Sequence, residues 1–340
     1  MSSLGQFYTT NYDYILQRME IPSETKYIIE PFAGRGDLLK FIKDKEKYQL
    51  ELYDIDPKKD NIIKRDTLKE PPDYKDKFVL TNPPYLARNK NKNKELYDKY
   101  KCNDLYKCFI LNLIASECQG GIIIVPLNFI SSNRKADQTL RAKFLAKYSI
   151  RILNIFEEKV FDDTAYSVCS IQFVKKDENK IKVYIYPSKK EFEISLTKEN
   201  NYTFGGELYN LAISKDYKIE RATKSNYKQN NITNILLKCI DDSIESKLCL
   251  SIVKDKDRFI DQTENLTARS YATLIISPKL TLDKQRELVS KFNEYIKKKR
   301  DEYHSLFLTN YRESNSIARK RISFELAFRI CNYILSSMNS

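Results

Sequence analysis

Short apolar runs alternate with amphipathic stretches along the first half of the chain. The apolar runs, rich in isoleucine and valine, predict buried strands at residues 26–30, 50–53, 62–66, 78–80, 122–125, 150–156 and 167–174. Helical spacing of apolar residues follows at 38–42, 104–119 and 135–148. Strands that alternate with helices predict a mostly parallel α/β sheet within residues 1–176.

The hydrophobic pattern changes after residue 176. A strand-like run at 182–186, a polar stretch at 255–271 and helical spacing at 282–303 replace the earlier alternation. Residues 318–336 predict a closing amphipathic helix that begins with the basic string at 319–321. We therefore expect two domains, residues 1–176 and residues 177–340.

The composition is that of a chain with a real hydrophobic core. Of its 340 residues, 41% are hydrophobic. No apolar run approaches the roughly 18 residues of a membrane span, and the N-terminus lacks the pattern of a secretory signal. Seven cysteines without a Cys-x-x-Cys pair and a single histidine, His304, predict no zinc site. We expect a cytoplasmic protein that holds no metal and contacts no membrane.

A glycine turn follows the first predicted strand and reads Pro31-Phe32-Ala33-Gly34-Arg35-Gly36-Asp37. Glycines permit a tight bend and a close ligand, and ligands of open α/β sheets bind beyond the carboxyl ends of the strands. The pattern is not Gly-x-Gly-x-x-Gly, and no Gly-Lys-Ser/Thr follows, which argues against a dinucleotide or P-loop site. Asp54 ends the next strand, where an acid can bind ribose hydroxyls. Asp66 ends the third segment.

The most specific motif is Thr81-Asn82-Pro83-Pro84-Tyr85, directly after the strand at 78–80. Consecutive prolines fix φ twice and remove two backbone donors, so the loop is stiff and rich in acceptors. The Asn82 amide oxygen and the Pro83 carbonyl oxygen are expected to converge on one site that suits a planar NH2 group. An ordinary Pro-Pro turn after a strand is the simpler interpretation of the motif alone.

The net charge of +13 favours a polyanion partner. Six basic and two acidic residues lie at 88–101, immediately after the Asn-Pro-Pro-Tyr loop. A solvated loop would explain such a run, but its place beside the candidate site favours contact with phosphates.

In this order and spacing, residues 6–175 resemble the S-adenosylmethionine-dependent DNA adenine-N6 methyltransferases of the gamma class, found in type II restriction-modification systems. Gln6-Phe7-Tyr8-Thr9-Thr10 is similar to an N-terminal element that wraps the cofactor, with Thr9 near its methionine end. The resemblance implies that Asp54 binds the ribose and that Asp66 reads the cofactor's adenine amine. The implied ligands of S-adenosyl-L-methionine are Tyr8, Thr9, Pro31, Phe32, Ala33, Gly34, Gly36, Asp54, Ile55, Asp66, Thr67 and Asn82.

The same resemblance implies a Rossmann-like class I methyltransferase fold, with a mixed, mostly parallel seven-stranded sheet and a smaller C-terminal α+β target-recognition domain. The implied catalytic residues are Asn82, Pro83, Pro84, Tyr85 and Phe161. Phe161 is expected to stack on a flipped-out adenine, with Tyr166 as the second choice. Double-stranded DNA is the implied partner of a monomer, and a cognate restriction endonuclease would act on the same site without required contact. The C-terminal residues also resemble methyltransferases of short palindromes such as CATG.

Other functions share parts of this pattern. A methyltransferase acting on an RNA amino group or on a protein glutamine amide would use the same Asn-Pro-Pro-Tyr loop. A nicotinamide oxidoreductase would need the missing third glycine. A metal-dependent nuclease would need acidic partners for Pro72-Asp73 or Asp255-Lys256, and the sequence offers none.

Overall fold

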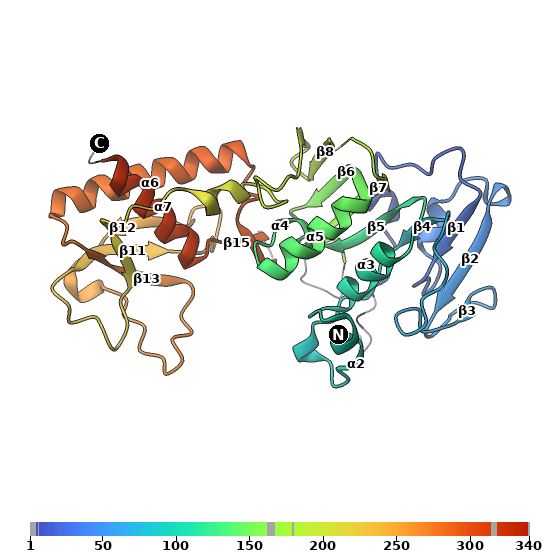
Figure 1. Ribbon diagram of the computed structural model, residues 1–340, viewed down its shortest axis with the longest axis horizontal. Coiled ribbons are helices and arrows are strands. Elements are labelled where there is room, and N and C mark those ends of the chain that lie inside the picture. The colour runs from blue at the N-terminus through green and yellow to red at the C-terminus, as the bar shows by residue number, and fades with distance from the viewer. Residues whose placement is uncertain (1–4, 6, 162–166, 179, 314–317, 339–340) are drawn as a thin grey trace. The chain divides into compact units, whose positions relative to one another are not determined.

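The computed structural model describes residues 5, 7–161, 167–178, 180–313 and 318–338. The chain divides into two compact units, Met1–Leu196 and Thr197–Ser340, which are described separately below (Figure 1).

The first unit is built on a nine-stranded sheet in the order β3-β2-β1-β4-β5-β7-β6-β8-β9. Its strands are β1 (Tyr27–Glu30), β2 (Gln49–Asp54), β3 (Ile63–Lys64), β4 (Phe78–Thr81), β5 (Gly120–Pro126), β6 (Tyr148–Phe156), β7 (Val168–Lys175), β8 (Ile181–Tyr186) and β9 (Lys190–Ile194). From β3 to β5 neighbouring strands are parallel, and β7 runs antiparallel between β5 and β6. This is the Rossmann-like mixed sheet that the sequence predicted.

Two strands extend the sheet beyond the predicted seven. β8 pairs in parallel with β6, and β9 pairs antiparallel with β8. The run predicted at 182–186 therefore belongs to the first unit, which continues to Leu196 rather than ending at residue 176. Four consecutive buried side chains at the end of β8, at 183–186, account for this placement, because they need a covering layer that an isolated hairpin lacks.

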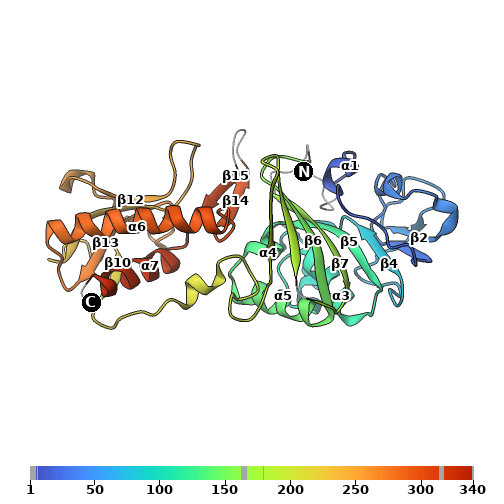
Figure 2. The same ribbon diagram turned by 90° about the horizontal axis from the view of Figure 1, so that it is seen from above.

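Helices cover the sheet of the first unit. α3 (Leu105–Ala115) and α5 (Lys135–Lys147) lie on one face, while α1 (Tyr12–Ile15) lies on the other (Figures 1 and 2). Shorter segments are α2 (Glu95–Tyr100), α4 (Asn128–Ser131), η1 (Leu38–Phe41), η2 (Lys45–Lys47) and η3 (Arg88–Lys90). The helix predicted at 38–42 is thus a single 3-10 turn, η1.

The buried strands bring the predicted motifs to one edge of the sheet. Every residue of β4 and β5 is buried, which fixes the register of the central strands. Because β1 pairs in parallel with both β2 and β4, their carboxyl ends meet. The glycine turn, Asp54 and Asn82 follow these three strands directly and therefore converge.

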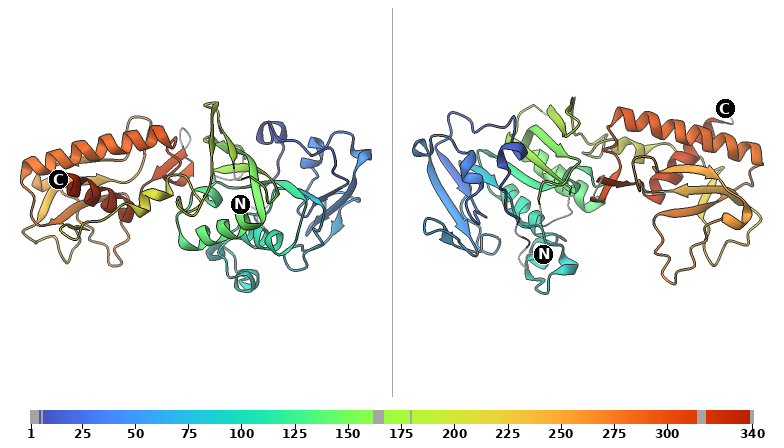
Figure 3. Two further views of the ribbon diagram at one scale, coloured as in Figure 1. Left: turned by 45° about the horizontal axis from the view of Figure 1, so that its top comes forward. Right: turned by 180° about the vertical axis from the view of Figure 1, so that it is seen from behind.

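The second unit packs two helices on a four-stranded antiparallel sheet in the order β10-β13-β11-β12 (Figure 3). Its elements are β10 (Lys218–Arg221), β11 (Ile232–Lys238), β12 (Cys249–Ile252), β13 (Tyr271–Ser277), α6 (Leu282–Glu302), α7 (Phe324–Ser337), β14 (Thr309–Glu313), β15 (Ala318–Arg321), η4 (Gly206–Asn210) and η5 (Asp255–Asp257). Leu237, Leu274, Phe292 and Ile330 belong to its core.

The prediction that the basic string begins the last helix is wrong. Residues 319–321 lie in strand β15, which pairs with β14. α7 begins only at Phe324, where the Ser323 hydroxyl caps the helix by accepting a hydrogen bond from the Leu326 N–H. A serine at this position satisfies an N-terminal donor that no residue within the helix can reach. Among the described residues, no helix has the length and apolarity that crossing a membrane requires.

Candidate active site

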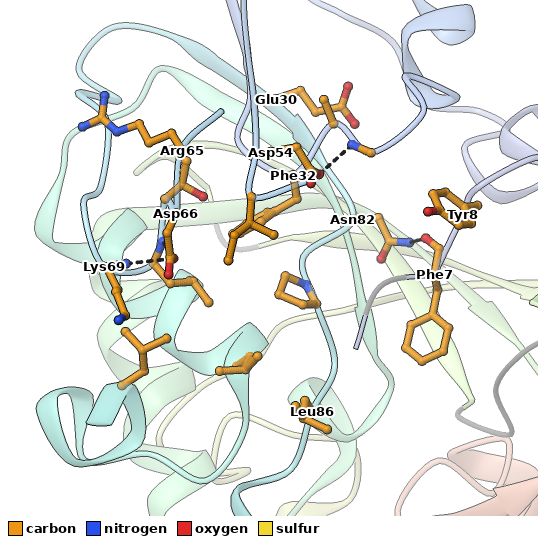
Figure 4. Close-up of a pocket in the computed structure, with 18 of the residues that line it drawn as sticks. Phe7, Tyr8, Glu30, Phe32, Asp54, Arg65, Asp66, Lys69, Asn82 and Leu86 are labelled. Atoms are coloured by element: carbon orange, nitrogen blue, oxygen red, sulfur yellow. Dashed lines mark hydrogen bonds between the residues drawn. The ribbon is translucent and has the colours of Figure 1, made fainter. Parts of the chain in front are cut away.

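A cavity of about 340 Å³ opens at the carboxyl ends of β1, β2 and β4 (Figure 4). Most of the residues that the sequence predicted as cofactor ligands line it: Tyr8, Thr9, Phe32, Ala33, Gly34, Asp54, Ile55, Asp66, Thr67 and Asn82. Pro31 and Gly36 are not part of its wall. The volume falls in the range of small-molecule sites, roughly 300–1,000 Å³.

The glycine turn forms the floor of this cavity. Gly34 and Gly36 have φ values of +52° and +72°, a region that L-residues with side chains adopt at a cost. The Ala33 N–H donates to the Tyr53 carbonyl at 2.8 Å, which joins the turn to β2. A Cβ at Gly34 would lie 3.3 Å from the Tyr8 ring, so glycine leaves room for the aromatic residue above the turn.

The Asp54 carboxylate stabilises the glycine turn by accepting backbone hydrogen bonds. Its Oδ2 accepts from the Gly34 N–H at 2.7 Å and its Oδ1 from the Asp56 N–H at 2.8 Å. The side chain is almost fully buried. Since a carboxylate can accept about four hydrogen bonds, Asp54 can hold the turn and still accept from ligand hydroxyls.

Asp66 lies across the cavity, after β3. Its Oδ1 accepts from the backbone N–H groups of Leu68 and Lys69, both at 3.2 Å. Thr67, next to it, donates from its hydroxyl to the Pro31 carbonyl at 2.9 Å. Pro31 therefore holds the opposite wall in place without reaching the cavity itself.

Glu30 is a cavity residue that the sequence analysis missed. It is 2% exposed, and its Oε2 has no hydrogen-bond donor among the described residues. Burial, followed by the nearby Asp54 and Asp37 carboxylates, raises the pKa of Glu30 well above its usual value. The Oδ2 of Asp37, also in the cavity wall, likewise lacks a donor in the described part of the chain. The sequence offered one signal for this role, because Glu30 is an acidic residue at the end of the apolar run at 27–30.

The Asn82 side chain is fixed on both sides. Its Nδ2 donates to the Phe7 carbonyl at 2.9 Å and to the Thr9 hydroxyl at 3.1 Å. A carbonyl can only accept, so the amide nitrogen faces the N-terminal segment and Oδ1 faces away from it. The Tyr85 hydroxyl contacts that Oδ1, and also the Ile124 carbonyl at 2.8 Å.

The other predicted catalytic residues are not all in the cavity wall. Pro84 lines the cavity, whereas the buried Pro83, Tyr85 and Phe161 do not. Burial raises the pKa of Tyr85 well above its usual value, so its hydroxyl stays protonated. Tyr166, the second candidate for stacking, and Gln6 lie outside the described residues.

The segment after the catalytic loop also contributes to the wall, which the sequence did not predict. Asn91, Asn93, Leu96 and Tyr97 line the cavity together with Leu86 and Leu105. The Tyr97 hydroxyl donates to the Leu86 carbonyl at 2.9 Å and accepts from the Asn91 amide at 3.1 Å. The basic segment at 88–101 is thus attached to the candidate site. Among the described residues, no group of three metal-binding side chains occurs.

Comparison with solved structures finds distant matches among restriction-modification proteins. A modification subunit of a type I restriction enzyme from Vibrio vulnificus is 13% identical, covers 57% of this chain and 56% of its own, and has a TM-score of 0.43. A type I methyltransferase subunit from Streptococcus thermophilus is 17% identical over 54% of this chain and 48% of its own, with a TM-score of 0.38. The chain thus spans about half the length of these two proteins.

Two further comparisons address the family. No curated protein matches the chain significantly. A sequence model described as N-6 DNA Methylase matches residues 46–273, more than half of the chain, including the second strand, the Asn-Pro-Pro-Tyr loop and much of the second unit. The chain therefore belongs to the N-6 DNA methylase family, whose members are S-adenosylmethionine-dependent adenine-N6 DNA methyltransferases.

Proposed function

We propose that the protein transfers a methyl group from S-adenosyl-L-methionine to N6 of an adenine in a short site of double-stranded DNA. The observation that carries this proposal is the Asn82 amide, held by Thr9 and the Phe7 carbonyl at the wall of a cavity built on a glycine turn. Family membership supports DNA methylation. The orientation of the Asn82 amide supports an amino group as the acceptor of the methyl group.

The cavity fits the proposed cofactor in charge as well as in volume. No donor in the described part of the chain reaches Glu30 Oε2 or Asp37 Oδ2. These carboxylate oxygens would suit a cation, and the α-ammonium of S-adenosylmethionine is one. Asp54 can accept from ribose hydroxyls, and Asp66 from the adenine amine. When bound, the cofactor supplies an electrophilic methyl group on a sulfonium.

Asn82 would activate the acceptor by orienting it. An adenine amine is a poor nucleophile because its lone pair is delocalised into the ring. Hydrogen bonds from its two N–H groups to Asn82 Oδ1 and the Pro83 carbonyl favour a pyramidal nitrogen with a localised lone pair. The site supplies position and preorganised dipoles, and the nitrogen loses its proton readily once it carries the extra methyl group.

The target adenine must leave the duplex to reach this site. Flipping a base costs a few kcal/mol, and stacking on an aromatic ring returns about 1–3 kcal/mol per base. We assign Tyr85 and Phe161 as the aromatic residues that hold the base. The basic segment at 88–101 would contact the DNA backbone, and the second unit would read the sequence of the site.

A direct assay tests the proposed substrate. Purified protein receives labelled S-adenosylmethionine with plasmid DNA, total RNA or release-factor protein, and Asn82→Ala serves as the matched control. We expect label in DNA at N6 of adenine only, and labelling by the variant about 10²–10³ times slower. Label in RNA or in a glutamine amide would identify that molecule, rather than DNA, as the substrate. Methylation-aware sequencing of DNA from expressing cells then gives the recognition site.

A further inference from the structure

The two aromatic residues assigned to the target base are both covered. Tyr85 is 2% exposed and Phe161 is 5% exposed, so neither offers a free ring face to an adenine. One residue that contacts both rings is Phe7, from the N-terminal segment. Figure 4 shows its ring below Asn82, beside the chain that carries Tyr8.

The Phe7 ring packs against both aromatic rings, stacked on Tyr85 and tilted against Phe161. Its centroid is 5.4 Å from that of Tyr85, with 30° between the ring planes, and 6.2 Å from that of Phe161, with 35° between planes. These separations are within the roughly 4.5–7 Å of paired aromatic rings. A flat ring thus already contacts both residues on which an adenine would have to stack.

The hydrogen bonds that fix Phe7 involve its backbone rather than its ring. The Phe7 carbonyl accepts from Asn82 Nδ2, and the Gly5 carbonyl accepts from the Tyr85 N–H at 2.9 Å. Further along the N-terminal segment, Asn11 Nδ2 donates to the carbonyl of Val160, the residue before Phe161, at 3.0 Å. The N-terminal segment can therefore stay attached to both walls while the benzyl side chain moves.

We propose that Phe7 is a third aromatic residue of the target-base site, which fills the site in the absence of DNA and is displaced by the flipped adenine. This inference rests on the proposed function, because it takes Tyr85 and Phe161 as the residues that hold the base. In this role Phe7 shields the two rings from water. It also competes with the base, so its removal makes base insertion more favourable.

The test measures base insertion directly. A duplex carries 2-aminopurine at the target position of the site found by methylation-aware sequencing, and its fluorescence rises when the base unstacks. With a non-reactive analogue of the cofactor present, Phe7→Ala should bind this duplex with a Kd roughly 3- to 10-fold lower than the parent, as expected from the loss of one or two ring contacts. Its fluorescence increase should also be larger. Phe7→Tyr, which keeps the ring, should behave like the parent.

Phe7→Leu keeps apolar volume without a ring face and serves as a second variant if Phe7→Ala does not fold. A Kd for either variant that equals or exceeds the parent's, or a smaller fluorescence increase, would show that Phe7 does not compete with the base and would overturn the inference. Methyl transfer by the parent is measured in parallel. An inactive parent would overturn the proposed function together with this inference, whereas an active parent isolates the role of Phe7.

Discussion

Asn82 Nδ2 donates a hydrogen bond to the Oγ1 of Thr9 at 3.1 Å, although the two residues lie 73 positions apart in the chain. This contact joins the N-terminal segment to the catalytic loop and sets the direction of the amide. With the nitrogen turned toward Thr9 and the Phe7 carbonyl, the oxygen faces away from the N-terminal segment and contacts the Tyr85 hydroxyl. In the proposed mechanism a substrate amine would bind this oxygen.

The first prediction concerns the Asn82 amide. Asn82→Ala removes an interaction that strengthens in the transition state and should lower kcat by about 10²–10³, with little change in DNA affinity. Thr9→Val removes one of two hydrogen bonds to the amide nitrogen and should cost only about tenfold. Single-turnover transfer of a labelled methyl group measures both, and a near-parental kcat for Asn82→Ala would exclude Asn82 from the mechanism.

The second prediction concerns Glu30 and the cofactor. Glu30→Gln keeps the shape of the side chain but removes the charge that would pair with an ammonium, and should weaken S-adenosylmethionine binding about tenfold. Burial and neighbouring acids raise the pKa of Glu30, so a bound cation would favour loss of the Glu30 proton. Affinity should therefore increase as the pH rises through this pKa in the parent, and less so in the variant.

Calorimetric titrations at a series of pH values check this dependence. The exposed Glu46, on the surface segment η2, provides the matched control as Glu46→Gln, which should bind the cofactor like the parent. Equal affinities for parent and Glu30→Gln at every pH would mean that Glu30 does not face the cofactor's cation.

The third prediction concerns the basic segment at 88–101. Lys92 and Lys101 are exposed there, and replacing both with glutamine should reduce the slope of log Kd against log salt concentration by about 2, because each phosphate contact contributes about 0.9. The same change at the exposed Lys43, just before η2, and Lys45, within η2, should leave the slope unaltered. Filter binding to duplex DNA from 50 to 300 mM salt would show the difference, and identical slopes for both pairs would place the DNA elsewhere.

Much of the site could be predicted because its signals are local. The glycine turn, Asp54 and Asn82 each follow an apolar run directly, and parallel pairing brings strand ends together. The parts that could not be predicted depend on distant partners. Nothing near Phe7 in sequence shows that its ring packs against Tyr85 and Phe161.

The differences between prediction and structure outside the site have the same origin. The predicted strand at 182–186 pairs with β6, which lies about 30 residues earlier, and pairing across that distance leaves no local pattern. The basic string at 319–321 was predicted as the start of a helix from the spacing of apolar residues over 318–336 alone. Pairing with β14, together with the Ser323 cap, places the string in a strand instead.

The last prediction concerns Asp104, which joins helix α3 to the catalytic loop by accepting a hydrogen bond from the Leu86 N–H at 3.2 Å. Burial raises the pKa of Asp104 to about 6, against about 3.9 in an unfolded chain. Between these values only the folded state holds the proton, so the stability that Asp104 contributes is complete below pH 4 and is lost as the pH rises through 6.

Asp104→Asn keeps an acceptor for the Leu86 N–H but cannot titrate. Relative to the parent, the variant should therefore gain about 2 kcal/mol in free energy of unfolding between pH 4.5 and pH 7.5. Urea unfolding followed by circular dichroism measures this, since the chain has no tryptophan to report by fluorescence. Parallel stability curves for parent and variant across this range would show that the carboxyl titrates alike in both states, so that burial leaves no proton on Asp104 in the folded protein.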